Sequence, residues 1–502
     1  MASPSCWRCL LRPSTAATPS PFPARHFTPL GLTTTTTTTK TILPATATTS
    51  ITATPSAAHS FSTSTPSYAG GRPGVHQRLG KRMQLSKFKK KKEIMRPKAP
   101  KPGERKAFRK RIVLSNNNAL PVRGLELMSP ARLASQESAG HVLKIPDHLI
   151  DRLRAVEAFK SSQTWEFFHS PHMLVRPETV HICERMGESV KDGSTARIVV
   201  SGGKAAGKSM TLLQAQIYAF MEKWVVINIP EAQELTTAAT DYAPIPDTDP
   251  QLWMQSSYAL KFMQAILAGN RAVLEKVYTT RSYEDFTNPV AEGATLVTLI
   301  ESAHEVDQAW SVFAAFWHEL FIVKADSAGT PRPPILFSAD GLASFMRTSD
   351  YRNQTFEPIH SHDLAIVRNF VDVLSGKTPL PSGGAVIGAT CRSNAARNPS
   401  MELAINRQLA RQQGPEAEMP QRDPYGRKYD ERVDAVMENT GIEVVNVQGI
   451  SKAEARSLLE YWAASGMMRA QINETTVSEK WMTGGNGIIG EMERAGLTCL
   501  RI

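Results

Sequence analysis

The apolar residues of this chain fall into short runs separated by longer amphipathic stretches. Four runs are mostly apolar with at most one charged residue each, and they cover residues 198–200, 224–230, 333–340 and 384–394. Stretches with helix-forming residues lie between them, an alternation typical of parallel strands joined by helices. The pattern predicts an α/β fold with a parallel sheet whose ligand lies at the carboxyl ends of the strands. We expect at least one further strand in the helical region between the second and third runs.

Helical patterns surround these runs. Before the first run, residues 145–159 form an amphipathic pattern with Pro146 near its first turn, and residues 173–186 begin extended and continue as a helix. Further helices are predicted over 210–220, 253–277 and within 291–322.

The last hundred residues have a different pattern. Residues 398–432 are polar and predicted to have little order, and 442–449 alternate like a strand. Ser451 and Glu454 fit a capping box that opens a helix, and 484–494 resemble a loop entering a short helix. We predict a small C-terminal domain, a helical lid or winged-helix-like. The expected division is a transit segment 1–65, a basic arm and connector 66–140, a nucleotide-binding domain 141–400 and a C-terminal domain 401–502.

Charge divides the chain into two parts. The net charge is +11, but residues 1–111 carry +19 and residues 112–502 carry −8. The basic character therefore belongs to the N-terminal part, while the body is mildly acidic. No run of 18 apolar residues occurs, so we expect no membrane span.

Residues 1–65 contain no Asp or Glu and are rich in Ser, Thr, Ala and Pro, with Arg8, Arg12, Arg25 and Lys40 as their cations. This composition is typical of a mitochondrial transit peptide. A merely disordered Thr-rich tail and a chloroplast address are the alternatives. We expect a disordered N-terminus in either case.

Residues 68–111 are strongly basic, and their prolines prevent a continuous helix. Such a segment buries too little apolar surface to fold alone, and its cations would displace counterions from a phosphate backbone. We predict an arm that contacts RNA; a solvated tail or a nuclear-localisation patch is the alternative. The residues expected to carry the contact are Lys87, Lys89, Lys90, Lys91, Lys92, Arg109, Lys110 and Arg111.

A glycine-rich loop between the first run and the next helix fits G-x-x-x-x-G-K-[ST] at every fixed position. In this strand–loop–helix context the pattern predicts a phosphate-binding P-loop, because backbone N–H groups at a helix N-terminus attract anions. Lys208 is expected to reach the β- and γ-phosphates, and the Ser209 hydroxyl to bind Mg²⁺. The nucleotide-binding residues predicted are Gly202, Gly203, Lys204, Ala205, Ala206, Gly207, Lys208, Ser209 and Met210.

Polar residues end the third and fourth runs. Asp340 is the expected Mg²⁺ ligand opposite Ser209, with an ordinary turn-starting Asp as the alternative. Thr390, Arg392 and Asn394 are candidates for a group that senses the γ-phosphate, or simply residues of a strand end. The residue after Asp340 is Gly341 rather than an acid that could activate water, which predicts slow hydrolysis or none.

Two histidines, His360 and His362, lie close together with no metal-binding pattern around them. We expect them at the surface or at a helix cap.

Several of these stretches together resemble the death-associated protein three family, and in particular a fungal member of it. The matching pieces are residues 173–176, the glycine-rich loop, 229–232, the strand that ends at Asp340 and Gly341, and 449–461. The resemblance covers roughly residues 140–500.

The resemblance implies an AAA+-like P-loop core with small C-terminal domain, bound GTP or GDP and Mg²⁺, and a place in the mitochondrial small ribosomal subunit. It further implies contact with small-subunit rRNA and ribosomal proteins, near the bridges to the large subunit, in the mitochondrial matrix. From the same resemblance we expect no membrane association and no homo-oligomer. The sequence has no [NT]-K-x-D motif for guanine, so ATP is the alternative nucleotide.

Three functions fit these observations. The first is a structural ribosomal protein that holds a nucleotide as a folding or assembly ligand and supports mitochondrial translation. The second is an active GTPase or ATPase switch, and the third is an AAA+-type remodelling ATPase unconnected to the ribosome. The third would be an oligomer with an arginine finger.

Overall fold

The computed structural model describes residues 112–325, 331–392, 398–414, 416–426, 429–438 and 441–498. All of them belong to the compact unit Met95–Ile502. The predicted transit segment and the predicted RNA-binding residues of the basic arm lie outside the described residues.

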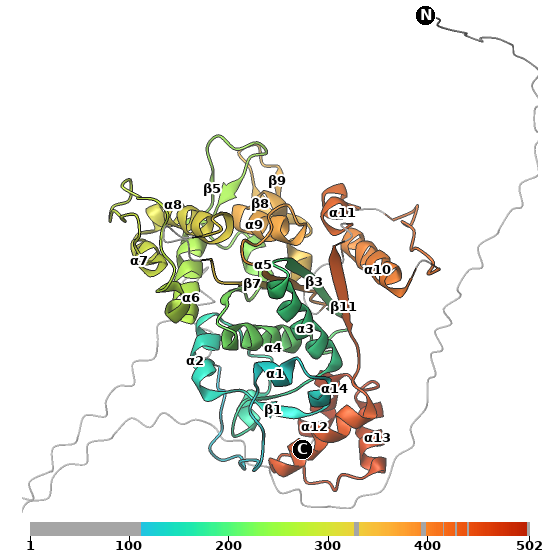
Figure 1. Cartoon of the computed structure of the whole chain (residues 1–502). Helices are drawn as coiled ribbons and strands as arrows, with labels where there is room; N and C mark the ends of the chain where they lie inside the picture. The colour runs from blue at the N-terminus through green and yellow to red at the C-terminus, as the bar shows by residue number, and fades with distance from the viewer. Residues whose placement is uncertain are drawn as a thin grey trace, which may run out of the picture. The chain divides into compact units, whose positions relative to one another are not determined.

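A five-stranded parallel sheet forms the centre of this unit (Figure 1). Its strands are β3 (Thr195–Gly202), β4 (Val225–Ile229), β7 (Ile335–Asp340), β10 (Gly384–Ala389) and β11 (Ile442–Val447), in the spatial order β11-β3-β10-β7-β4. The four strands predicted from apolar runs are β3, β4, β7 and β10. The prediction of an α/β fold with a parallel sheet is confirmed.

The fifth strand corrects two expectations. It does not come from the helical region between β4 and β7, and the 442–449 stretch is not part of a separate C-terminal domain. Instead β11 pairs in parallel with β3, from Ile442 opposite Arg197 to Val447 opposite Gly202. The alternating sequence of β11 identified a strand, but periodicity gives no information about which strand becomes its partner.

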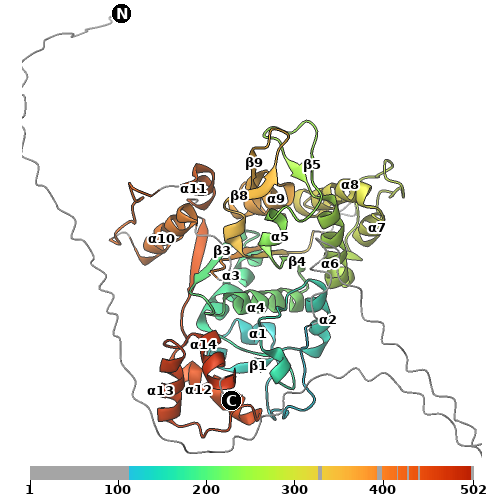
Figure 2. The ribbon, with the colours of Figure 1, turned by 180° about the vertical axis from the view of Figure 1, so that it is seen from behind.

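Helices cover both faces of the sheet (Figures 1 and 2). Val199 faces the larger apolar cluster, with side chains from α6 (Ser256–Leu274), α7 (Leu296–Glu301), α8 (Val306–Trp317) and α9 (Ala365–Leu374). Its neighbours Ile198 and Val200 face a second cluster with α2 (Asp147–Ala155), α3 (Pro177–Lys191) and α4 (Lys208–Met221). Because both faces are buried, the strands are nearly continuous apolar runs.

Residues 398–432 are more ordered than expected. Helix α10 (Pro399–Gln413) begins at Asn398, whose side chain accepts a hydrogen bond from the Met401 N–H at 3.2 Å. Helix α11 (Glu431–Met437) follows it and packs against it. The expectation of little order is wrong for α10, because its apolar residues are few but lie on the one side that meets the sheet.

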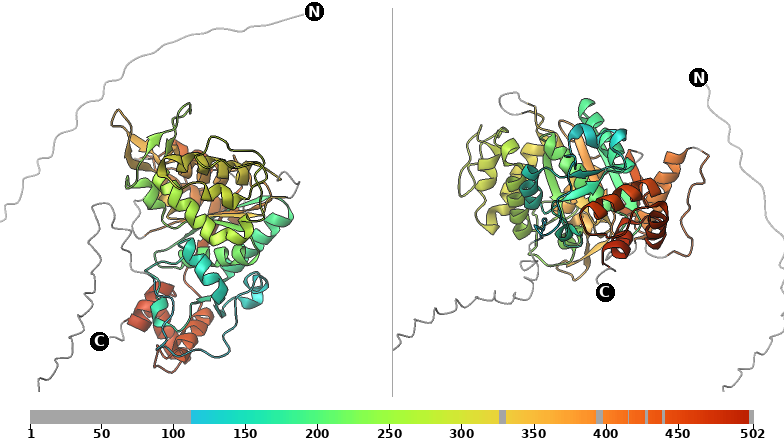
Figure 3. Two further views of the ribbon diagram at one scale, coloured as in Figure 1. Left: turned by 90° about the vertical axis from the view of Figure 1, so that its left-hand side faces the viewer. Right: turned by 90° about the horizontal axis from the view of Figure 1, so that it is seen from below.

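Small elements complete the described chain. The further helices are α1 (Pro130–Leu133), α5 (Ala232–Thr236) and, at the C-terminal end, α12 (Lys452–Ala464), α13 (Glu474–Thr483) and α14 (Ile489–Glu493). The remaining described strands form three antiparallel pairs: β1 (Val142–Lys144) with β2 (His172–Leu174), β5 (Ala243–Pro244) with β6 (Trp253–Met254), and β8 (Thr348–Arg352) with β9 (Pro358–His360). The capping box of Ser451 and Glu454 opens α12 as predicted. Figure 3 shows the three C-terminal helices beside the segment that carries β1. None of the helices in the described ranges has the length and apolar character needed to cross a bilayer.

His360 and His362 are both buried, so the expectation of surface histidines is wrong. His360 does act as a cap, because its ring accepts the His362 N–H at 3.1 Å. Burial lowers the pKa of His362 to about 3, which leaves its imidazole neutral. The rings of the two histidines also pack edge to face, with their centroids 4.4 Å apart.

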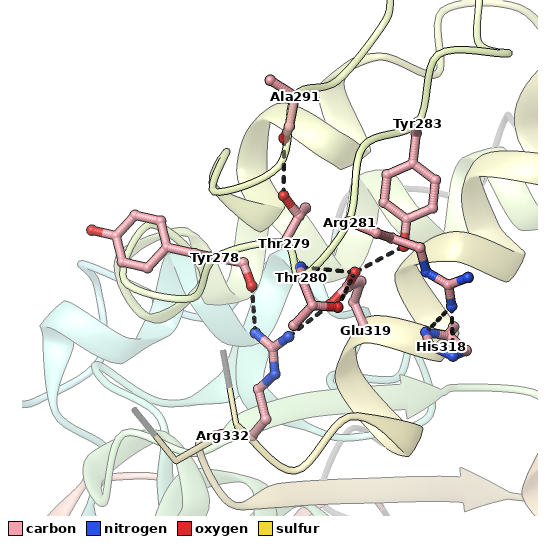
Figure 4. Close-up of polar contacts among 9 residues, drawn as sticks. All are labelled: Tyr278, Thr279, Thr280, Arg281, Tyr283, Ala291, His318, Glu319 and Arg332. Carbon is pink, nitrogen blue, oxygen red and sulfur yellow. Dashed lines mark hydrogen bonds and ion pairs between the residues drawn. The ribbon is translucent and has the colours of Figure 1, made fainter. Parts of the chain in front are cut away.

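A buried ion pair holds the loop after α6 against the end of α8 (Figure 4). The Glu319 carboxylate accepts three hydrogen bonds. Their donors are the Arg332 guanidinium at 2.7 Å, the Tyr283 hydroxyl at 2.9 Å and the Thr280 N–H at 3.0 Å. Both charged side chains are fully buried, and Arg332 also donates to the Tyr278 carbonyl at 2.8 Å. These bonds compensate the desolvation of the two charges, so the cluster is structural.

Side-chain amides bind the main chain at both edges of the sheet. The buried Asn270 of α6 accepts the Val226 N–H of β4 and donates to the Val226 carbonyl, each at 2.8 Å. At the other edge the Gln412 amide faces Val444 of β11 at 3.1 and 3.2 Å, in the orientation that pairs donor with acceptor. Each amide therefore takes the place of a neighbouring strand for one residue.

We predict that Asn270→Ala lowers the free energy of unfolding by about 2–4 kcal/mol, because two buried backbone groups lose their partner. Urea unfolding followed by circular dichroism measures this. Gln264→Ala, at an exposed position of the same helix, is the control and should change stability by less than about 0.5 kcal/mol. Equal effects of the two substitutions would contradict the role given to Asn270.

Candidate functional site

The glycine-rich loop joins the carboxyl end of β3 to the first residue of α4. Gly202 has φ 148°, and a Cβ there would lie 2.1 Å from the Val447 carbonyl oxygen of β11. Gly207 has φ 106° at the N-cap of α4. Both glycines are therefore required by the backbone, and the loop lies at the N-terminus of a 14-residue helix, where backbone N–H groups favour an anion.

Lys208 is buried beneath this loop. Its ammonium donates to the carbonyls of Gly202 at 3.1 Å and Gly203 at 2.5 Å. Burial lowers the pKa of Lys208, and the negative charge of Asp340 only partly offsets this. An anion bound in the loop would restore the solvation that the ammonium has lost.

Ser209 and Asp340 are brought together from α4 and β7. The Ser209 hydroxyl donates to Asp340 Oδ2 at 2.6 Å, and Asp340 is buried at the last residue of its strand. The Lys160 ammonium forms an ion pair with the same carboxylate oxygen. Sequence patterns gave no sign of Lys160, because it lies in the connector after α2, 180 residues from Asp340.

Strand β10 lies between β3 and β7, so its end faces the space between the loop and Asp340. Thr390 is buried there, and its hydroxyl donates to the Val200 carbonyl at 3.2 Å. Arg392 is exposed and lines the same cavity. Asn394 lies outside the described residues.

The loop is tied to two distant segments by Arg176, which precedes α3. Its buried guanidinium donates to the carbonyls of Ala206 and Gln448 and to the Glu178 carboxylate, each at 2.8 Å. Arg176 belongs to the stretch that carries the family resemblance, but sequence reasoning gave it no role. No local pattern could have done so, because Gln448 lies 272 residues further along the chain.

A cavity of about 500 Å³ opens beside the loop. The loop, Asp340 and the end of β10 form its polar end. The remaining wall is largely apolar and includes Trp165, Phe168, Leu458 and Trp462. Burial lowers the pKa of His172, in the same wall, to about 3, so this imidazole is neutral and packs on the Tyr461 ring.

The C-terminal helices close one side of this cavity. The Gly490 N–H donates to the Ala205 carbonyl at 3.1 Å, and a Cβ on Gly490 would lie 2.8 Å from the Ala205 Cβ. Only glycine allows this approach. A charged end with a buried cation, next to an apolar chamber, can bind the phosphates and the ring system of one amphipathic ligand.

Few protein groups at this site could bind a divalent cation. Among the described residues, no group of three or more His, Cys, Asp or Glu is placed to bind a metal. The Ser209 hydroxyl and the Asp340 carboxylate are hard oxygen donors that suit Mg²⁺, which usually takes its other ligands from phosphates and water. These two residues therefore fit a metal that arrives with an anion rather than a structural metal.

We predict that Arg176→Met lowers the free energy of unfolding by about 2–4 kcal/mol, because the partly exposed Glu178 carboxylate and two carbonyls lose their buried donor. Chemical denaturation measures the loss. Arg185→Met is the matched control in α3; its half-exposed ion pairs should contribute about 0–1 kcal/mol. A loss below about 1 kcal/mol for Arg176→Met would show that other contacts hold the loop.

Comparisons with known proteins agree with the resemblance seen in the sequence. The family model of "Mitochondrial ribosomal death-associated protein 3" matches residues 173–495. A Neurospora crassa protein named "Small ribosomal subunit protein mS29" is 47% identical over 502 residues, which is all of both chains. A Schizosaccharomyces pombe protein of the same name is 21% identical over 359 residues, 70% of each chain.

The matched range contains the glycine-rich loop, Asp340 and the C-terminal helices, and thus most of the cavity described above. The full-length similarity to the Neurospora protein also includes residues 1–111. The chain belongs to the mitochondrial ribosomal death-associated protein 3 family.

Proposed function

We propose that this chain is a structural component of the mitochondrial small ribosomal subunit that holds a purine nucleotide, GTP or GDP, together with Mg²⁺. The observation that carries the proposal is the convergence of Lys208, Ser209 and Asp340 at one end of a cavity, in a chain whose full-length relative is a small ribosomal subunit protein.

The loop and its neighbours suit the phosphates. Backbone N–H groups of residues 203–209 would bind phosphate oxygens, and Lys208 would neutralise their charge. Ser209 and Asp340 would hold Mg²⁺, whose chemistry there is to neutralise and orient the phosphates. Lys160 already places a cation at Asp340. These features favour an AAA+-like P-loop core, with the C-terminal helices as its lid.

Binding without rapid turnover is the function that the cavity supports best. The residue after Asp340 is Gly341, with φ 92°, and so no acidic side chain follows the metal ligand. The Thr390 hydroxyl, a candidate sensor of the γ-phosphate, is bonded to a backbone carbonyl. An active GTPase or ATPase switch, or a remodelling ATPase, would need a water-activating group that this end of the cavity does not offer among its described residues.

Ribosome attachment is supported by the distribution of charge. A segment of net charge +19 precedes a body of net charge −8. The arm would contact rRNA phosphates, and the body would contact ribosomal proteins, including those at the bridges to the large subunit. The proposed location is the mitochondrial matrix, to which residues 1–65 would direct the chain.

We predict that Lys208→Ala abolishes nucleotide binding, because the phosphates lose their buried cation. Bound nucleotide stabilises a fold by mass action, by about 2.7 kcal/mol at 100 times Kd. The wild-type chain should therefore melt at higher temperature with Mg²⁺ and GDP, and the variant should not. Lys223→Ala, at an exposed position two residues beyond the end of α4, is the control and should respond like the wild type. Full retention of nucleotide by Lys208→Ala would contradict the phosphate site.

We predict that replacing Lys87, Lys89, Lys90, Lys91 and Lys92 by Gln weakens attachment to small-subunit rRNA, most strongly at low salt, and makes the remaining attachment less sensitive to salt, because fewer counterions are released from the RNA. Sedimentation of a mitochondrial lysate in Mg²⁺, over a series of salt concentrations, measures how much of the chain migrates with the rRNA. Replacement of the same residues by Arg keeps the charge and should keep attachment. Migration of the wild-type chain as a free species or a homo-oligomeric ring would instead favour the switch or the remodelling ATPase.

A further inference from the structure

Two carboxyl groups line the cavity among the described residues, and only one of them lies at the phosphate end. Asp340 is bound by Ser209 and Lys160. The other is Glu493, the last residue of α14, which enters the cavity from the C-terminal wall.

The fold determines where Glu493 lies. Gly490 contacts the loop through its bond to Ala205, and Met492 is fully buried in the C-terminal cluster. Glu493 lies one helical turn, about 5 Å, beyond Gly490. Its carboxyl is hydrogen-bonded to Thr164, the neighbour of Trp165 in the apolar wall. Helix α14 therefore begins beside the glycine-rich loop, and its last residue places a carboxyl group beside the apolar wall of the cavity.

This carboxyl group is poorly solvated. Burial raises the pKa of Glu493 to about 7, and the Thr164 hydroxyl and the charge of Arg494 only partly oppose this. Arg494 itself donates to Glu491 at 2.6 Å. A ligand that brought two N–H donors to the carboxylate would stabilise its ionised form.

Guanine carries such a pair of donors, N1–H and the N2 amino group, on one edge. Adenine carries a lone pair at N1 and a single amino group at N6, so a carboxylate on that edge meets an acceptor. The chain lacks the [NT]-K-x-D motif that commonly supplies the carboxylate for guanine, so a preference for guanine would need hydrogen-bond acceptors from elsewhere in the cavity.

We infer that Glu493 binds the N1–H and N2 amino groups of the base and selects guanine over adenine. The inference rests on the proposed nucleotide site and adds the residue that determines its base specificity. A site built to bond an N–H group rejects ligands that lack it strongly, by up to about 10⁴-fold, so we expect at least ~100-fold preference for GDP over ADP.

The test uses the full-length chain stripped of nucleotide, with Mg²⁺ present. Fluorescent analogues of GDP, ADP and xanthosine diphosphate are titrated to obtain three dissociation constants. Xanthine has N1–H and a carbonyl at C2, which match the acceptor and the donor of a carboxamide. Glu493→Gln should therefore bind GDP ~100-fold more weakly and xanthosine diphosphate correspondingly more tightly, so that the order of the two ligands reverses.

The control is Glu479→Gln, an exposed acid of α13, which should leave all three constants unchanged. If Glu493→Gln weakened the binding of all three ligands equally, the residue would have a merely structural role and the inference would be overturned. An unchanged ratio of GDP to ADP would also overturn it. A wild-type chain that bound none of the three would overturn the proposed function, and this inference with it, whereas binding without base preference would overturn the inference alone.

Discussion

The shape of the cavity depends on one buried guanidinium. Arg176 joins the entry to α3, the glycine-rich loop and the segment after β11, through bonds to Ala206 and Gln448. Hydrogen bonds from a charged donor are about twice as strong as neutral ones, so this side chain contributes strongly to holding the three segments together. The position of the loop relative to the sheet edge, and hence of Lys208 and Ser209, follows from this side chain.

Several other buried polar groups of the unit also have partners in distant parts of the chain. Glu319 and Arg332 join the loop after α6 to α8, and Asn270 joins α6 to β4. The apolar clusters provide most of the driving force for folding, but they specify orientation weakly. The polar contacts need specific partners and therefore add orientation to this packing.

Much of this architecture could be predicted from the sequence, because its signals are local. The strand–loop–helix around Gly202 and Lys208, the capping box at Ser451 and the strand ending in Asp340 each occupy fewer than thirty residues. The contributions of Lys160, Arg176 and Glu493 to the cavity could not be predicted, nor could the pairing of β11 with β3. They depend on contacts between segments that are far apart in sequence, and composition or periodicity carries no information about such contacts.

The residues that line the cavity run from Lys160 to Arg494, so they come from most of the described chain. A ribosome synthesises residue 160 long before residue 493, and the loop therefore exists for some time without its C-terminal wall. Only when α14 has docked on Ala205 is the binding chamber complete. A ligand that needs both walls of the cavity would therefore be retained only by chains whose C-terminal helices have folded onto the loop.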